Sequence, residues 1–177
     1  HIGLEADELE RIANEDGVVK ASTRDLAVLA SSKQSAATTV AATAHLAALA
    51  GISVFATGGL GGVHRGDGFD ESADLRALSI TPVTIVCAGV KSILDVAATL
   101  ERLETLAIPV LGYKTNKFPG FYLTDSGFQI EHRVDTPAQI AEIWRARNEV
   151  NIAETAIIVT NPVANELDRT LHDKLLN

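Results

Sequence analysis

The chain has 177 residues, of which 46% are hydrophobic, 21% charged and 5% aromatic, with a single cysteine. This composition indicates a globular domain with a buried core, and it excludes a disordered chain, a collagen-like chain and a disulfide scaffold. The formal charge of -8 argues against broad binding of nucleic acid or anionic membranes, because both need a basic face. We expect a soluble cytoplasmic protein, since a lone cysteine fits a reducing compartment.

The first residue is His1, and the sequence contains no methionine. We therefore expect the natural product to begin further upstream. Residues 38–50 form the longest apolar run, which polar side chains interrupt and which is too short to span a bilayer. No signal peptide is visible in the opening residues.

Helical and extended segments alternate along the chain, which predicts an α/β fold with α/β/α layers around a largely parallel or mixed central sheet. We expect helices at residues 5–14, 23–30, 35–50, 72–79 and 91–106, at 136–137 onward, and after 162. We expect strands at residues 18–21, 52–56, 83–87, 108–113 and 156–160. No internal repeat or linker is found, so one domain is expected.

Loops at the carboxyl ends of parallel strands converge on the ligand crevice of such folds. Here those loops are residues 57–74, 88–92 and 113–122. The first contains four glycines between Gly58 and Gly62, which would let the backbone approach a ligand closely. A dinucleotide fingerprint fails, because His64 stands where its third glycine is required.

Residues 64–74 gather ionisable and hydroxyl side chains behind the glycines. His64 and Arg65 offer donors for a phosphate, while Asp70 and Asp74 offer hard oxygen ligands suited to magnesium or manganese. An alternative interpretation has Asp70 as the N-cap of a helix and Asp74 as a first-turn charge that the helix dipole favours. Spacing alone leaves both interpretations open.

Lys91 follows a predicted strand and is expected to open a helix. The positive end of the helix dipole, with partial burial, would lower the pKa of the amine toward that of a Schiff-base nucleophile. The alternative is an exposed lysine whose stem covers Val90 or Ile93.

Other reactive residue types have less specific surroundings. Cys87 lies in an apolar strand and is predicted to be a buried small hydrophobe. His45 is predicted to be packed and hydrogen-bonded within a helix, whereas His132 and His172 have surface-like contexts. The aromatic cluster at residues 118–122 would line a pocket for a planar ring or cover the edge of the core.

Several long motifs in order resemble the pseudouridine-5'-phosphate glycosidases, also called the indigoidine synthase A-like family. The matching stretches are Gly51–Gly66, Phe69–Leu75 and Val86–Asp95, with shorter matches at Thr38–Val40, Thr99–Thr105 and Phe118–Tyr122. The resemblance covers most of residues 1–125 and then fades. It implies reversible cleavage of the carbon–carbon glycosidic bond of pseudouridine 5'-phosphate with water, giving uracil and ribose 5-phosphate.

The same resemblance implies that Lys91 forms a covalent imine with C1 of the ring-opened ribose. A carbon–carbon glycoside has no leaving oxygen to protonate, and an iminium at C1 supplies the electron sink that lets the uracil carbon leave. Asp70 would hold a divalent metal, normally manganese, and His64 and Lys20 would lie at the phosphate. The further implied substrate contacts are Val40, Ser72, Ala73 and Asp74. A homotrimer is also implied.

The chain departs from the family pattern at several points. The family's proton-donating glutamate would lie upstream of His1 and its uracil-binding asparagine segment beyond Asn177, so residues 1–177 are expected to be the central part of the family domain. The loop before Asp70 is short, and Glu71 replaces an apolar residue. Two alternatives therefore stay open: another Schiff-base lyase or aldolase acting on a phosphosugar, and a non-catalytic ligand-binding fragment.

Overall fold

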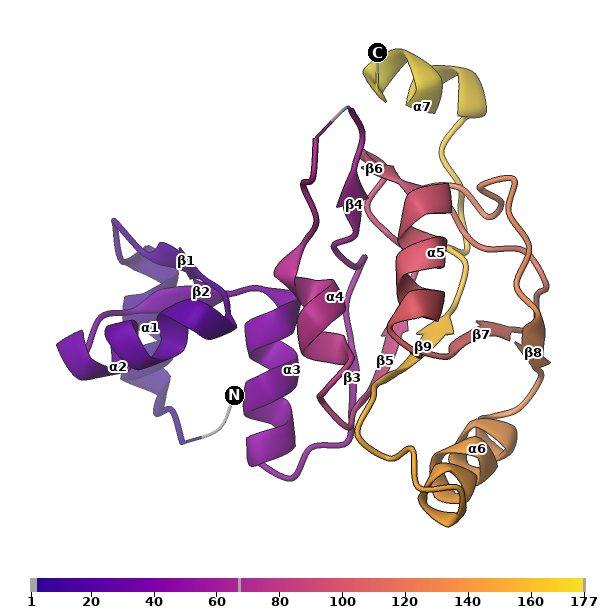
Figure 1. Ribbon diagram of the computed structural model, residues 1–177. Helices are drawn as coiled ribbons and strands as arrows, with labels where there is room; N and C mark the ends of the chain where they lie inside the picture. The colour runs from indigo at the N-terminus through magenta and orange to yellow at the C-terminus, as the bar shows by residue number, and fades with distance from the viewer. Residues whose placement is uncertain (1–2, 67, 177) are drawn as a thin grey trace.

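A computed structural model describes residues 3–66 and 68–176 (Figure 1). Its centre is a five-stranded, fully parallel sheet in the order β3-β5-β9-β7-β8. These strands are β3 (Val54–Ala56), β5 (Thr84–Cys87), β7 (Val110–Tyr113), β8 (His132–Val134) and β9 (Ile157–Thr160). Two small sheets accompany it, made of β1 (Val19–Ala21) with β2 (Ala36–Thr38) and of β4 (Val63–His64) with β6 (Leu94–Asp95).

Helices lie on both faces of the central sheet, which confirms the predicted α/β fold. They are α1 (Ala6–Asn14), α2 (Leu26–Ser32) after a 3-10 turn at Thr23–Asp25, α3 (Val40–Leu49), α4 (Ala73–Leu78), α5 (Val96–Thr105), α6 (Pro137–Glu149) and α7 (Arg169–Leu176). In the described residues, no helix is both long and apolar enough to cross a membrane.

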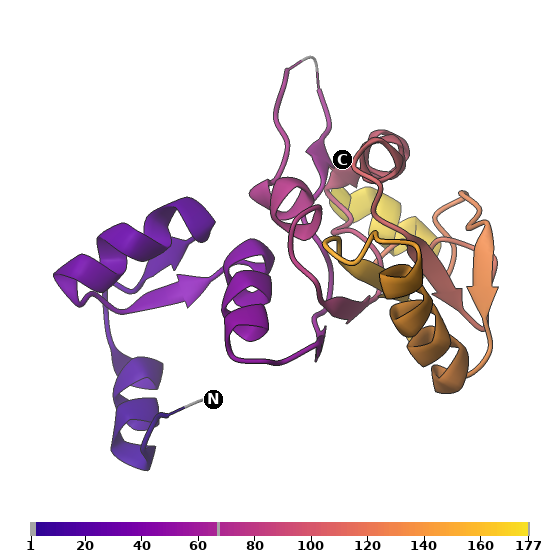
Figure 2. The same ribbon diagram turned by 60° about the horizontal axis from the view of Figure 1, so that its bottom comes forward.

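Alternate residues of β9 face two different cores, as expected for a strand buried on both sides. Ile158 belongs to the main core, which also takes in Leu78 of α4 and Leu103 of α5. Its neighbours Ile157 and Val159 belong to a second cluster, against which Trp144 of α6 packs. The helices α3, α4 and α5 therefore cover one face and α6 the other (Figure 2).

The N-terminal elements project to one side of the sheet, beyond α3 (Figures 1 and 2). The helix expected at residues 35–50 is wrong in its first part, because Ala36–Thr38 pairs with β1 as a parallel strand. Thr39 then caps α3 by accepting a hydrogen bond from the Ala42 N–H at 3.4 Å. A threonine favours a cap over a helix interior, so the chain changes from strand to helix at this residue.

The helix expected from residue 91 begins later, at Val96. Asp95 caps it by accepting from the Ala98 N–H at 2.9 Å. The residues before it form a turn, closed by the Leu94 N–H to the Lys91 carbonyl at 2.9 Å, and then β6, which pairs antiparallel with β4. The cap predicted at Thr136 and Pro137 is confirmed as a capping box.

Candidate functional site

A polar pocket of about 490 Å³ lies where the N-terminal elements meet the start of α4. It brings together most of the residues predicted to bind substrate or metal, which are Lys20, His64, Asp70, Ser72, Ala73 and Asp74. Val40 does not line it, because its side chain packs against the main core, although its neighbour Thr39 does. We call this space the polar pocket.

Residues from β1 and the 3-10 turn form one side of the polar pocket. Lys20 is the central residue of β1, held opposite Ala37 of β2, and it is exposed. Arg24 and Asp25 follow, joined by an ion pair of 3.4 Å. Arg24 was not singled out from the sequence. Its position directly after a parallel strand, close behind Lys20, is the pattern that points to it.

Asp74 forms part of the pocket floor and is only 4% exposed. Its Oδ1 accepts from the Ala41 N–H and its Oδ2 from the Gly61 N–H, each at 2.8 Å. A Cβ at Gly61 would come 2.2 Å from the Ser72 hydroxyl and 2.6 Å from Asp74. The Asp74 carboxylate therefore ties α3 and the glycine loop to the first turn of α4.

The glycine loop makes room for the protein's own side chains. At Gly59, an added Cβ would come 2.5 Å from the ring of Phe121. At Gly59 and Gly61, the space beside the backbone is therefore filled by side chains of the protein, whereas the sequence suggested that a ligand would approach there.

Asp70 is not an N-cap, because Ser72 takes that role and accepts from the Asp74 N–H at 3.2 Å. The Asp70 carboxylate instead lies 3.8 Å from Nδ1 of His64, with 72% of its side chain exposed. The neighbouring Glu71 is engaged elsewhere, because Arg102 donates to both of its oxygens at 2.7 and 2.9 Å and lowers its pKa.

Within residues 3–66 and 68–176, no group of three or more His, Cys, Asp or Glu side chains could enclose a metal ion. Asp70, with 72% of its side chain exposed, offers a hard oxygen ligand that is open to solvent at the polar pocket. A single carboxylate is compatible with a magnesium-like or manganese-like cation that keeps most of its water ligands.

Lys91 lies in the turn after β5 and is exposed. Because α5 begins five residues later and is capped by Asp95, the dipole argument made for a helix opening at Lys91 is wrong. The exposed lysine of the alternative interpretation is closer to what is found. Lys91 lines a second space of about 450 Å³, which we call the aromatic pocket, with Phe121, Tyr122 and residues of the C-terminal segment.

Arg65 joins the loop of Lys91 to the loop of His64. Its guanidinium donates to the Ser92 carbonyl at 3.1 Å and to the Leu94 carbonyl at 3.2 Å, while His64 pairs with Leu94 in the β4–β6 ladder. Arg65 therefore organises these two loops, whereas the sequence predicted that Arg65, together with His64, would donate to a phosphate.

Of the remaining predictions for single residues, the one for Cys87 is confirmed, and those for His45 and His172 are wrong. Cys87 is buried as predicted, and burial raises the pKa of its thiol to about 11. His45 is exposed, so its predicted packing is wrong. His172 is 8% exposed, against the expected surface position, because α7 packs its ring toward the loops around Lys91.

The chain is similar in sequence to a known protein family and to several named proteins. Residues 1–177 match the family model described as indigoidine synthase A like protein. Proteins named pseudouridine-5'-phosphate glycosidase from Salinispora tropica and Streptomyces griseus are 55% and 56% identical over 99% of this chain and 55% of their own length. The chain therefore spans about half the length of these curated relatives.

Two solved structures share the fold at a TM-score of 0.90. One is an indigoidine synthase A-like protein from Thermotoga maritima, 39% identical over 98% of this chain and 59% of its own. The other is the prealnumycin C-glycosynthase AlnA in complex with ribulose 5-phosphate, 36% identical over 96% of this chain and 57% of its own.

Proposed function

Because the chain belongs to the indigoidine synthase A-like family, we propose that it cleaves pseudouridine 5'-phosphate reversibly into uracil and ribose 5-phosphate. The observation that carries this proposal is the identity of about 55%, over nearly the whole chain, to relatives named for that activity. A fold neighbour solved with ribulose 5-phosphate supports a pentose phosphate as the ligand class.

The polar pocket is the proposed site of the phosphate. Lys20, Arg24 and His64 all line it, and each can donate hydrogen bonds to an anion. Ser72 adds a hydroxyl at the start of α4. Lys20 and Arg24 are the lysine and arginine side chains among the described residues that line this pocket.

Lys91 is the proposed nucleophile. Its neutral amine attacks C1 of the ribose, and the ring oxygen leaves and takes a proton. The nitrogen lone pair then forms a carbon–nitrogen double bond as the bond from C1 to uracil breaks, and the uracil carbon takes a proton. Water hydrolyses the iminium, which releases ribose 5-phosphate and restores the lysine.

Asp70 is the proposed protein ligand of a manganese ion. Such an ion would neutralise charge on substrate oxygens when bound. Asp70→Asn keeps the shape of the side chain and removes its charge. We expect this variant to need a higher manganese concentration for half-maximal turnover, whereas an unchanged manganese requirement would remove Asp70 from the role.

Assembly as a homotrimer and a cytoplasmic location belong to the same proposal. The homotrimer follows from the family resemblance, and the cytoplasmic location follows from the lone cysteine, which fits a reducing compartment. Light scattering of the protein expressed from its complete reading frame measures the first directly, and a mass other than three times that of the chain would contradict it.

A second candidate is formation or cleavage of another carbon–carbon bond to a phosphosugar. This second candidate is supported by the 36% sequence identity to a protein named as a C-glycosynthase. The higher identity to the glycosidases favours uracil as the leaving group.

The proposal is tested by incubating the protein with pseudouridine 5'-phosphate and manganese and measuring the released uracil by chromatography. We expect turnover by the protein expressed from its complete reading frame and none by its Lys91→Arg variant. Lys33→Arg, at the exposed end of α2, is the matched control and should retain full activity. A sugar phosphate adduct without uracil release would favour the second candidate. The absence of both the adduct and uracil release would favour a binding fragment.

A further inference from the structure

Arg65 follows β4 directly and contacts the turn that carries Lys91. We propose that Arg65 is a positioning residue for Lys91. Its guanidinium fixes the turn at residues 91–94 so that the Lys91 amine is presented to C1 of the sugar, and Arg65 itself contacts neither the sugar nor the phosphate. This inference rests on the function proposed above and adds to it a residue that sets the rate of imine formation.

The pairing of β4 with β6 brings Arg65 to this turn. His64 pairs with Leu94 in the antiparallel ladder. Because the two strands run in opposite directions, the same register sets Arg65 opposite Ile93. Ile93 is 60% exposed and lies at the tip of the turn. The ladder therefore places a long side chain with five N–H donors beside the backbone that leads from Lys91 into β6.

The guanidinium of Arg65 spans the tip of the turn. Its Nη2 donates to the Ser92 carbonyl at 3.1 Å and its Nε to the Leu94 carbonyl at 3.2 Å. One planar group thus fixes a backbone carbonyl on each side of Ile93. An arginine fork can hold both carbonyls in one geometry, whereas the ammonium of a lysine is a point charge on a flexible stem.

The backbone of Lys91 is tied to the same residues. Its N–H donates to the Leu60 carbonyl at 3.1 Å, and its carbonyl accepts from the Leu94 N–H at 2.9 Å. Leu94 is therefore shared, because its N–H bonds to Lys91 and its carbonyl to Arg65. A shift of Leu94 after loss of the guanidinium would reach Lys91 through a single residue.

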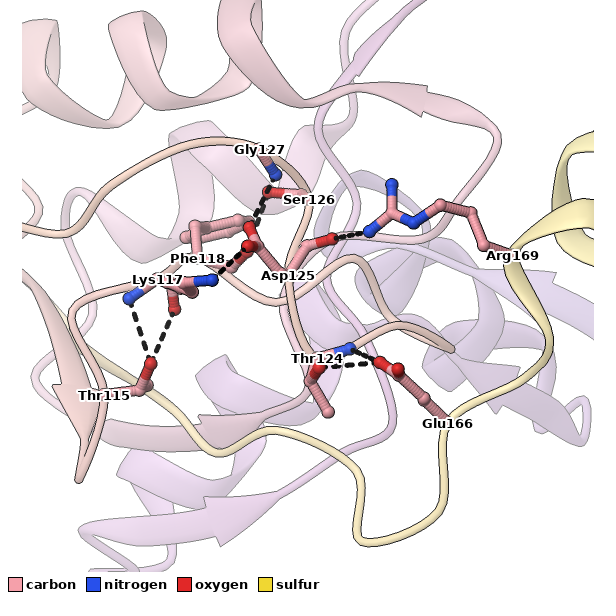
Figure 3. Close-up of polar contacts among 9 residues, drawn as sticks. All are labelled: Thr115, Lys117, Phe118, Thr124, Asp125, Ser126, Gly127, Glu166 and Arg169. Atoms are coloured by element: carbon pink, nitrogen blue, oxygen red, sulfur yellow. Dashed lines mark hydrogen bonds and ion pairs between the residues drawn. The ribbon is translucent and has the colours of Figure 1, made fainter.

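The other side of the turn rests on the segment at residues 118–126, which we call the Tyr122 loop. The Ser92 hydroxyl donates to the Gly120 carbonyl of this loop at 3.3 Å. Within the loop, the Ser126 hydroxyl donates to the Phe118 carbonyl at 2.7 Å (Figure 3). The Tyr122 loop is thus closed on itself close to its contact with the turn.

The Tyr122 loop is also fastened to the C-terminal segment of the chain. Glu166 accepts from the Thr124 N–H and hydroxyl at 2.9 and 2.6 Å (Figure 3). The Leu167 N–H donates to the Tyr122 carbonyl at 2.9 Å. The turn before β6 therefore has a fixed support on this side, and the guanidinium of Arg65 supplies the support on the other.

The position of Arg65 fits a role in the rate of reaction better than a role in binding phosphate. The described residues that line the polar pocket include His64 and Asp70, whereas Arg65 lines a different space of about 320 Å³ together with Ser92 and Gly120. A displacement of about 1 Å at a reacting group, caused by a change outside the chemistry, can cost about a hundredfold in rate. We therefore expect loss of Arg65 to slow attack by Lys91 without weakening the hold on the phosphate.

The test separates the rate of imine formation from the binding of the sugar. The protein expressed from its complete reading frame is treated with borohydride over a range of ribose 5-phosphate concentrations, and the sugar on Lys91 is quantified by mass spectrometry. We expect Arg65→Ala and Arg65→Lys to lower the trapping rate at saturating sugar by about tenfold or more, with the half-saturating concentration unchanged. A guanidinium that bound phosphate would instead raise the half-saturating concentration and would be replaced in part by lysine, and that result would overturn the proposal.

Arg133→Ala is the matched control. Arg133 is an exposed arginine of β8 that also donates through Nε and Nη2, in this case to Asp135 at 2.9 and 2.7 Å. We expect this variant to trap the sugar at the wild-type rate. Arg65→Lys keeps a long cationic side chain, so it keeps the test decisive should Arg65→Ala misfold.

Amide hydrogen exchange at Leu94 separates this inference from the proposed function, because it needs no turnover. The Leu94 N–H closes the turn on Lys91, so its exchange should be about tenfold faster in Arg65→Lys than in the wild type or in Arg133→Ala. Unchanged exchange at Leu94, or an unchanged trapping rate at saturating sugar, would overturn the role of Arg65. Absence of trapping at Lys91 in the wild type would overturn the proposed function, and exchange would still decide whether Arg65 fixes the turn.

Discussion

The backbone N–H of Ala41 donates to Oδ1 of Asp74 at 2.8 Å, which fixes the start of α3 to the first turn of α4. Oδ2 of the same carboxylate accepts from Gly61. Asp74 therefore shapes the polar pocket from beneath, while Asp70, four residues earlier, presents its carboxylate to solvent. The two residues are both aspartates of one short segment, but Asp74 is a buried acceptor for backbone N–H groups and Asp70 is exposed to solvent.

Replacing Asp74 by alanine should destabilise the fold by about 2–4 kcal/mol, because two buried N–H groups lose their acceptor. Asp70→Ala should change the free energy of unfolding by no more than about 0.5 kcal/mol. Urea denaturation followed by circular dichroism measures both. Equal losses in the two variants would contradict the division of roles.

Cys87 should be inert in the folded protein. Burial raises the pKa of its thiol to about 11, so the reactive thiolate is scarce at pH 8. A chromogenic disulfide reagent should label it slowly in buffer, and rapidly once urea unfolds the chain. Fast labelling without denaturant would show that β5 is open to solvent.

Acid should loosen the contact between the Tyr122 loop and the C-terminal segment. Hydrogen bonds from Thr124 lower the pKa of Glu166, and the hydrogen bond from Lys117 lowers that of Asp125. A carboxyl with a lowered folded pKa stabilises the fold above its unfolded value, about 4 for these groups, and this contribution fades as pH falls through the folded value.

Amide hydrogen exchange at Thr124 reports this change, after correction for the intrinsic pH dependence of exchange. We expect protection to be constant from pH 7 to about 5 and to fall below about 4. Glu166→Gln should remove most of the pH dependence. Protection that stays constant down to pH 3 would contradict the role of these carboxylates.

The inner strands β5 and β9 follow from the sequence because they are short apolar runs buried on both faces, as Ile157–Thr160 illustrates. The edge strand β8 could not be predicted, since His132 and Arg133 are exposed and only Val134 is buried. β2 was also missed, because Ala36 and Ala37 suit a helix and become a strand only by pairing with β1. In both cases tertiary pairing overrides local preference.

Some features of the candidate site could likewise be predicted from local sequence, and others depend on contacts between distant residues. Spacing brought Asp70, Ser72 and Asp74 together because they flank one helix start, which is local information. That Asp74 uses both oxygens on backbone N–H groups of distant residues is long-range, as is the burial of His172 by α7. Lys91 was recognised through its motif, although the helix expected to lower its pKa begins at Val96.

The most direct test of the account is the identity of the residue that forms an adduct with ribose 5-phosphate. The protein expressed from its complete reading frame is incubated with the sugar and manganese, reduced with borohydride, digested and mapped by mass spectrometry. The account predicts one modified peptide carrying the sugar phosphate on Lys91, and none in the Lys91→Arg variant. Modification of another lysine, or none in the wild type, would contradict it.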